Sequence, residues 1–353
     1  MKKIEARKYP NVKFLNDDEI QKEVIDLVAF NRSDTYWEEL NYVLDSFMSM
    51  IAQARFVGGY DDMYSIPHDK IHAITRNIKT CVGHYLKGRI GSSFTSFYRG
   101  WNKLWEEDTP DPSKILELKK DIIFYKLRKK EKTLFSRKDF FHIPFEKRGI
   151  IGNNRFSISG YPCLYLGRSI YTCWEEIRQP QLAEISASAF KVEKDIKLLD
   201  LRLTPKIDSL AKECSYLYLL PYILASSIRT HNDNDVFKPE YIIPQLLLHS
   251  VIKQNAHYDY DGVIFSSTRR NVKFSDKGMD LFDNVAIPVM SNRGNSYCKT
   301  LASYFTEVEP IYFEHEFLKG NISYSPTGTS KYEDTVFHSM EKILRQKEFD
   351  KIL

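Results

Sequence analysis

The sequence lacks the paired cysteines and histidines that mark a structural metal site. Its nine histidines show no metal-ligand spacing, no HExxH motif occurs, and none of the five cysteines belongs to a CxxC pair. These cysteines are Cys81, Cys163, Cys173, Cys214 and Cys298. An odd number of scattered cysteines is typical of free thiols in a reducing compartment. The pattern predicts a cytoplasmic protein without a zinc site or a metal cofactor.

Long apolar runs and a large net charge are also missing. No uninterrupted apolar stretch is long enough to cross a bilayer, and the initial segment MKKIEARKYPNVKF has no apolar core. We therefore expect no membrane partner and no secretory signal. The net charge is only +4, from 51 basic and 47 acidic residues, which gives no general case for nucleic acid binding.

Two common catalytic motifs are absent as well. The segment GRIGSS (Gly88–Ser93) lacks the lysine of a phosphate-binding loop, and no GxSxG elbow is present. The chain does have 353 residues, of which 42% are hydrophobic, so it can form one large domain or two ordinary ones. The sequence therefore predicts a folded protein that is neither a P-loop enzyme nor an α/β-hydrolase.

Helical spacing dominates the first 94 residues. EIQKEVIDLVAFN and WEELNYVLDSFMSMIAQ repeat apolar residues every three or four positions, and HDKIHAITRNIKTCVGHYL is a third helix candidate. HEPN-type ribonucleases, a helical class, carry an arginine followed by a histidine six positions later. Arg76 and His84 are too far apart for that signature. A structural or partner-binding role is the better interpretation of this region.

Residues 103–150 contain a basic segment interleaved with aromatic residues. Seven of its positive charges are Lys119, Lys120, Lys126, Arg128, Lys129, Lys130 and Lys132. Such a patch can bind nucleic acid or substrate phosphates. The favoured interpretation is a solvated helix face whose aromatic residues pack inward, since acidic residues dilute the charge. His142, which follows, either reaches an active site or is a hydrogen-bonded structural residue.

The stretch Arg155–Glu176 is the most informative part of the chain. In RFSIS, strand-like alternation would place Arg155 on one face and Phe156 on the other. In PCLYLG, Leu164 and Leu166 share one face, while Cys163 and Tyr165 take the opposite one. These two patterns predict consecutive short strands that bring an arginine and a tyrosine close to the helix that follows.

Ser169 is placed to cap that helix, which we expect to begin at about Ile170. An apolar stripe runs along it through Ile170, Cys173, Trp174 and Ile177. Glu175 lies nearly opposite the stripe, so we expect it to face solvent. Glu176 lies at the flank, where a carboxylate can face a cleft. Both glutamates can equally be ordinary solvated side chains.

Taken together, these residues resemble the core of the RES domain, a family named for its arginine, glutamate and serine. FYRGWN (Phe97–Asn102) resembles the opening Tyr-Arg motif of that family, and GVIFSSTR (Gly262–Arg269) resembles its serine strand. PEYIIPQLLLHSVIK (Pro239–Lys253) is similar to the helix before that strand. The resemblance covers roughly residues 95–290. It implies an α/β (α+β) fold in which a core like that of ADP-ribosyltransferases, made of sheets flanked by helices, follows a helical N-terminal region.

The resemblance also implies an activity and a set of site residues. RES proteins act on NAD+, and characterised members are toxins that destroy it by hydrolysis or phosphorolysis, with a cognate antitoxin as partner. The expected catalytic residues are Glu176, Arg155 and Tyr165. The expected substrate-binding residues are Arg99, Tyr98 and Ser267, with Ser266 as the alternative serine. NAD+ is then the substrate, inorganic phosphate is an alternative co-substrate to water, and homodimers are common among relatives.

The chemistry suits these residue types. Nicotinamide leaves NAD+ as a neutral group, while the ribose develops positive charge that a carboxylate such as Glu176 can stabilise. Arginines match pyrophosphate oxygens, so Arg99 and Arg155 fit that group. Tyr165 can stack on the nicotinamide or hydrogen-bond the ribose. Two alternatives remain open, an ADP-ribosyltransferase acting on a macromolecule and an inactive binding module that uses residues 114–138.

The expected domains are a helical region over residues 1–94, a RES-like catalytic domain over 95–300 with a basic insertion at 103–150, and an extension over 301–353. Within the catalytic domain, IKLLDL, DGVIFSS and NVAIPV predict buried strands. The extension is expected to finish in a helix, VFHSMEKILRQKEF.

Overall fold

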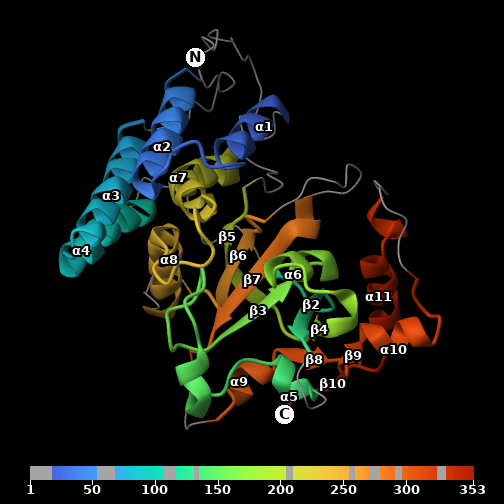
Figure 1. The fold of residues 1–353 in the computed structure, drawn as a ribbon. Coiled ribbons are helices and arrows are strands. Elements are labelled where there is room, and N and C mark those ends of the chain that lie inside the picture. Colours follow the sequence, from blue (N-terminus) through green and yellow to red (C-terminus); the bar gives the residue numbers. More distant parts are fainter. Residues whose placement is uncertain are drawn as a thin grey trace. The chain divides into compact units, whose positions relative to one another are not determined.

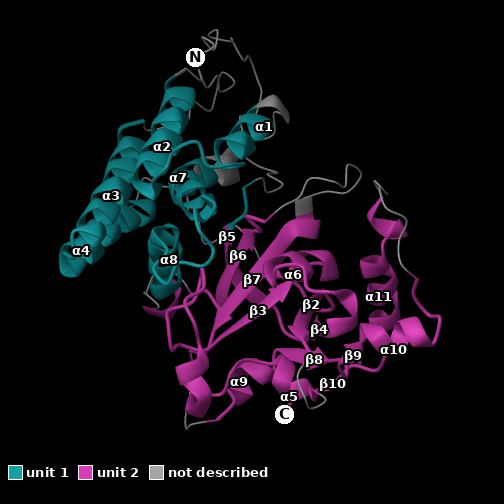
Figure 2. Cartoon of the chain, viewed as in Figure 1, with its two compact units in different colours: residues 1–115, 201–250, 255–258 teal, residues 116–200, 251–254, 259–353 magenta. Residues whose placement is uncertain are grey.

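A helical unit and a sheet-based unit make up the computed structural model of the chain (Figures 1 and 2). The structure describes residues 18–53, 68–106, 117–130, 135–203, 210–253, 259–269, 279–290, 296–323 and 331–353. Unit 1 comprises residues 1–115, 201–250 and 255–258, and unit 2 comprises residues 116–200, 251–254 and 259–353. The expected domain ranges stay a prediction. In this division the described residues 95–106 and 210–250 belong to unit 1, and residues 301–323 and 331–353 belong to unit 2.

Unit 1 is formed by helices. They are α1 (Asp18–Leu27), α2 (Tyr36–Gln53), α3 (His68–Leu86), α4 (Ile90–Trp101), α7 (Leu210–Ser227) and α8 (Ile242–Lys253), whose last residues belong to unit 2. An aromatic cluster joins α4 to α7, with Trp101 and Tyr222 edge to face at 5.4 Å between ring centroids. Gly100 lies in this contact, because a Cβ there would come within 2.8 Å of the Tyr222 hydroxyl. The three predicted N-terminal helices are confirmed.

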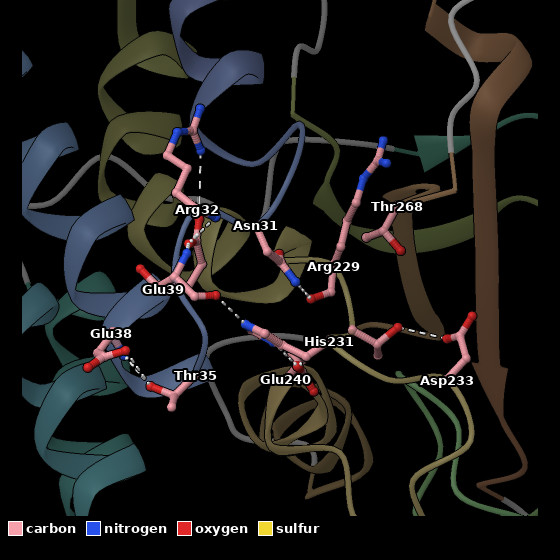
Figure 3. Close-up of polar contacts among 12 residues, drawn as sticks. Asn31, Arg32, Thr35, Glu38, Glu39, Arg229, His231, Asp233, Glu240 and Thr268 are labelled. Carbon is pink, nitrogen blue, oxygen red and sulfur yellow. Dashed lines mark hydrogen bonds and ion pairs between the residues drawn. The ribbon is translucent and has the colours of Figure 1, made fainter.

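Buried charges also tie the loops of unit 1 together (Figure 3). Glu39, 1% exposed, accepts hydrogen bonds from the backbone N–H groups of Arg32 at 2.7 Å and Ser33 at 2.9 Å. His231 Nδ1 lies 2.7 Å from Glu240 Oε1, and His231 Nε2 lies 3.1 Å from the Ser33 carbonyl oxygen. The turn before α2 is thus bound to the loop after α7, although some 198 residues separate them in sequence.

The centre of unit 2 is a ten-stranded sheet, counted over the part of the chain that the structure describes. Its strands are β1 (Glu117–Leu118), β2 (Ile123–Lys129), β3 (Cys163–Gly167), β4 (Ile185–Val192), β5 (Ile196–Leu201), β6 (Gly262–Ser266), β7 (Asp283–Pro288), β8 (Phe305–Glu307), β9 (Ile311–Tyr312) and β10 (Asp350–Lys351). The order across the sheet is β1-β5-β6-β7-β3-β2-β4-β8-β10, and β9 pairs with β4. The predicted strands at IKLLDL, DGVIFSS and NVAIPV are confirmed.

Helices cover both faces of this sheet. They are α5 (Arg137–Phe140), α6 (Ile170–Glu176), α9 (Lys299–Ala302), α10 (Phe313–Leu318) and α11 (Val336–Arg345), the last of which confirms the predicted C-terminal helix. Leu164 and Leu166 are buried in the core on one face with Phe124, while Tyr125 packs in the core on the other face with Ile170. The alternation predicted for β3 is therefore confirmed. Each fully buried leucine contributes roughly 1.5–3 kcal/mol to folding.

Two local predictions are wrong. The basic segment is not a helix face, because β2 runs through it as an inner strand between β3 and β4. RFSIS is not a strand but a tight turn, with a bridge between Asn154 and Ser157. In the basic segment, pairing with β3 and β4 overrides the local pattern. In RFSIS the alternation forms only a local bridge, and a strand needs neighbours that the sequence pattern alone does not reveal.

Most basic side chains around β2 are neutralised within unit 2. Lys119 lies 3.0 Å from Asp195, and Lys120 lies 3.6 Å from Glu193. Lys129 and Lys130 lie 3.2 Å and 2.5 Å from the carboxylates of Glu184 and Glu314. Lys132 is outside the described residues. The charges noted in the sequence thus serve mainly as partners for acidic residues.

Candidate active site

The short helix α6 positions the proposed catalytic carboxylate. Ser169 is its N-cap, with an extended backbone (φ −141°, ψ 155°) and a side-chain oxygen that accepts the Thr172 N–H. The Ser169 hydroxyl also donates to the Leu281 carbonyl oxygen at 2.8 Å. The predicted start of the helix is therefore confirmed, and its cap is attached to the segment before β7. This attachment links α6 to the neighbouring strand.

Gly167 lets α6 lie directly against the end of β3. A Cβ at this position would meet Cys173 Sγ at 2.7 Å and Asn284 Oδ1 at 3.3 Å. Cys173 in turn donates a hydrogen bond to the Tyr125 carbonyl oxygen at 3.2 Å. Only a residue without a side chain permits this approach, so the local sequence fixes how close α6 lies to the sheet.

Glu176 is held at the end of α6 by donors from two other elements. Its Oε1 accepts hydrogen bonds from Ser267 Oγ at 2.7 Å and from Asn284 Nδ2 at 2.8 Å. Its Oε2 lies 3.9 Å from Arg269 Nε. The side chain remains 37% exposed, so the carboxylate is both oriented and accessible. One oxygen is engaged by the protein, and the other faces a guanidinium and solvent.

The register of the sheet explains which serine reaches Glu176. Phe265 of β6 lies opposite Asn284 of β7, which lies opposite Gly167 of β3. Ser267 is two positions after Phe265 and therefore shares the face of the sheet that α6 covers. Ser266 points to the other face, where its hydroxyl lies 3.5 Å from Asp283 Oδ1. The structure brings Ser267, and not Ser266, to the carboxylate.

Arg155 reaches the same end of β6. It lies in the turn after residue 154, and its Nη2 donates to Thr268 Oγ1 at 3.4 Å. The neighbouring Phe156 is buried against Phe265, with ring centroids 4.3 Å apart, which anchors the turn on β6. Arg155 is therefore beside the residue that follows Ser267.

Tyr165 lies on the same face of the sheet as this cluster. It stands opposite Ala286 of β7, two positions before Gly167, and is partly buried. Arg99 and Tyr98 belong to α4 of unit 1, where Arg99 is exposed and the Tyr98 hydroxyl lies 2.7 Å from His249 Nδ1. Participation of these two residues in the site stays a prediction.

Glu175 does not face solvent as the helix pattern predicts. It is 7% exposed, and its Oε2 accepts a hydrogen bond from Gln179 Nε2 at 2.8 Å. Helix α6 is also covered on a second side by α11, whose Phe337 packs on Tyr171 and Trp174 with ring centroids 5.4 and 5.1 Å away. A single apolar stripe cannot reveal this second contact.

His142 has the structural role that we set beside the functional one. It is 1% exposed, its Nε2 accepts the Cys298 N–H at 2.8 Å, and its Nδ1 lies 2.8 Å from the Ile143 carbonyl oxygen. Burial lowers the pKa of His142 below its usual value. Over the described residues, no three His, Cys, Asp or Glu side chains are grouped as metal ligands.

Sequence reasoning missed Asn284 and Arg269. In the sequence, Asn284 is the first residue of a predicted strand, and Arg269 ends the segment that resembles the serine strand. A polar amide at the start of an otherwise apolar strand is the one signal that pointed to Asn284. A carboxylate oriented by a serine and an amide, near a guanidinium, is suited to stabilising positive charge or orienting a nucleophile.

Comparisons with known proteins identify relatives of this chain. The family model of the RES domain matches residues 125–287, which include Arg155, Glu176 and Ser267. A Bacillus subtilis (strain 168) protein described as "Putative toxin YopC" is 34% identical over 298 residues. That alignment covers 77% of this chain and 66% of the relative, just under two thirds of its length. No solved structure matches. No helix in the described parts of the chain has the length and apolar character needed to span a membrane.

Proposed function

The chain belongs to the RES domain family, and on this premise we propose that it is a toxin that consumes NAD+ by cleaving the nicotinamide–ribose bond. The observation that carries the proposal is the pair of hydrogen bonds from Ser267 and Asn284 to one oxygen of Glu176. They hold an accessible carboxylate in a fixed orientation within the RES domain. The relative described as a toxin supports the biological role.

The proposed reaction is a displacement at the anomeric carbon of the nicotinamide ribose. The bond between this carbon and the nicotinamide nitrogen breaks, and its electron pair neutralises the positive ring nitrogen. An oxygen of water or of inorganic phosphate forms the new bond, and water loses its proton to solvent or to a nearby base. Glu176 stabilises the positive charge that develops on the ribose.

The other residues bind and orient the substrate in this proposal. Arg155 and Arg269, at the same end of β6, offer donors that match pyrophosphate oxygens. Tyr165 supplies an aromatic surface or a hydroxyl on the same face of the sheet. Ser267 sets the direction of the carboxylate. Arg99 and Tyr98 stay the other expected substrate-binding residues, and a cognate antitoxin is the expected protein partner.

The test is to incubate the purified protein with NAD+, with and without inorganic phosphate, and to separate the products. Nicotinamide with ADP-ribose indicates hydrolysis, and ADP-ribose 1-phosphate formed only with phosphate indicates phosphorolysis. Label from NAD+ that remains on a macromolecule would instead favour ADP-ribosyl transfer. No consumption of NAD+ by the folded protein would contradict the proposal.

Glu176→Gln tests the catalytic assignment, because it removes the charge and keeps the shape. We expect kcat to fall by roughly 100-fold or more, since electrostatic stabilisation is usually a large part of catalysis. Glu348→Gln makes the same change at an exposed position and is the matched control. Turnover within about twofold of the unaltered protein in a folded Glu176→Gln variant would reject the role of Glu176.

A further inference from the structure

A buried glutamate outside the matched RES segment holds the start of α6. Glu341 lies on α11, after residue 287, and is 3% exposed. Its Oε1 accepts the Ile170 backbone N–H at 2.8 Å and the Tyr332 hydroxyl at 2.5 Å. Its Oε2 lies 3.7 Å from His338 Nδ1 and 3.9 Å from Arg345 Nη2. Both carboxylate oxygens therefore lie close to donors.

The hydrogen bond to Ile170 matters because α6 is only seven residues long. A helix of this length is not stable by itself in water, so its position depends on tertiary contacts. The Ile170 N–H is one of the first-turn donors that have no partner within a helix. A negative carboxylate at this end is also favoured by the helix dipole.

The other end of the same helix carries Glu176. A shift or rotation of the first turn moves the Glu176 carboxylate relative to Ser267 and Asn284. The reason is that fewer than two helical turns separate Ile170 from Glu176, so the two ends of α6 move together. A displacement of about 1 Å in a catalytic group can cost on the order of 100-fold in rate. The Ser169 cap and Glu341 both hold this first turn from outside the helix backbone.

We propose that Glu341 is a positioning residue for Glu176, so that the segment carrying α11 forms part of the catalytic apparatus and not a dispensable extension. The proposal rests on the proposed function, since it concerns the same carboxylate. Glu341 acts through the first turn of α6 and does not itself touch the substrate.

The surroundings of Glu341 give this role a pH dependence. Burial raises the pKa of Glu341 above its usual range, against the opposing effects of the Tyr332 and Ile170 hydrogen bonds and of the positive Arg345 and Arg168. Tyr125, which accepts a hydrogen bond from Arg345 Nε at 2.6 Å, also lies near Glu341, as do His338 and the Cys173 thiol. As the pH falls through the raised pKa, the carboxylate becomes protonated and its interaction with the helix start weakens. Protonation of Glu341 should therefore contribute to the fall of kcat at the acid side of its pH profile.

The experiment compares Glu341→Gln with Glu348→Gln, which removes a negative charge from an exposed position of the same segment. For each variant, kcat and KM for NAD+ are measured from pH 5 to pH 8, together with thermal unfolding. Amide hydrogen exchange of residues 170–172 is measured in parallel. We expect Glu341→Gln to lower kcat by about 5- to 10-fold with KM within about twofold, to flatten the acid limb and to speed exchange at Ile170.

Thermal unfolding separates positioning from general stability. Removing a buried charge with a raised pKa should leave the melting temperature of Glu341→Gln at pH 8 unchanged or higher, although activity falls. A loss of kcat that merely follows a lower melting temperature, or an unchanged pH profile and exchange rate, would overturn the proposal. Glu341→Ala, which removes the acceptor altogether, should lower kcat further than Glu341→Gln does.

The outcomes also distinguish this proposal from the proposed function. If the unaltered protein does not consume NAD+, the function fails, and hydrogen exchange at residues 170–172 still decides whether Glu341 holds the helix. If NAD+ is consumed but Glu341→Gln matches Glu348→Gln in every measurement, the function stands and the positioning role is rejected.

Discussion

The hydroxyl of Ser267 donates to the carboxylate of Glu176 at 2.7 Å, across 91 residues of sequence. Ser267 follows β6, and Glu176 ends α6, which follows β3. In the sheet β7 separates β6 from β3, so the two residues come from neighbouring parts of the sheet. Ser267 also accepts the Arg269 backbone N–H at 3.1 Å, so its hydroxyl is fixed on both sides. A serine and a glutamate within the matched RES segment are thus joined by a hydrogen bond.

Ser267→Ala should lower kcat for NAD+ cleavage by roughly 10-fold, because Glu176 Oε1 loses one of its two donors among the described residues. Steady-state kinetics of the purified variant give the value. Ser266→Ala is the matched control, since that hydroxyl lies on the opposite face beside Asp283, and its kcat should stay within about twofold. Equal losses in the two variants would contradict the assignment of Ser267.

Gly167→Ala should destabilise the protein by about 1–3 kcal/mol, because the new Cβ would lie 2.7 Å from Cys173 Sγ. Urea unfolding measures the change in the free energy of unfolding. Gly152→Ala, where a Cβ meets open space, should be nearly neutral.

The double variant Gly167→Ala with Cys173→Ala checks the cause of this effect. Removing the sulfur should recover part of the stability that Gly167→Ala loses, because the contact that forces α6 away is gone. If the double variant is as unstable as the sum of the two single changes, the crowding does not come from Cys173.

Glu307→Gln should stabilise the protein at alkaline pH. Burial raises the pKa of Glu307 to about 9, although the Ser188 hydroxyl donates to it at 2.9 Å. A folded-state pKa above the unfolded value near 4.5 means that this carboxyl favours folding below pH 4.5 and that the benefit is lost as the pH rises toward 9. A glutamine does not titrate, so the stability of the variant does not fall with pH through this position.

Chemical unfolding at pH 5 and pH 9 provides the measurement for Glu307. The two proteins should have similar free energies of unfolding at pH 5, and the variant should be more stable at pH 9 by at least about 1 kcal/mol. Glu309→Gln alters an exposed glutamate nearby and should show no such pH dependence. A Glu307→Gln variant that is less stable at pH 9 would contradict the prediction.

His231→Ala should lower the stability of unit 1 by about 1–3 kcal/mol, because Glu240, only 2% exposed, loses the imidazole that lies 2.7 Å away. Combining it with Glu240→Gln should recover part of that loss, since the buried carboxylate is then removed. Thermal unfolding of both single variants and the double variant forms the cycle. Strict additivity would show that the two side chains do not interact.

The sequence by itself determined the features that depend on interactions within a few residues. Ser169 as a helix cap, the alternation of Leu164 and Leu166, and the helices and core strands follow from hydrogen-bonding groups and apolar spacing within a few residues. The resemblance to the RES domain was also readable, because it rests on short motifs such as Arg155–Glu176 and Gly262–Arg269. These predictions needed no knowledge of what packs against what.

Only the tertiary structure decided which polar groups meet. It buried Glu175, which accepts a hydrogen bond from Gln179, and left Glu176 accessible. It made a strand of β2, since β3 and β4 lie on either side, and it chose Ser267 over Ser266 through the register of β6 with β7. It also brought Asn284 and Glu341 to the two ends of α6. Each result depends on contacts between residues far apart in sequence, which a local pattern does not contain.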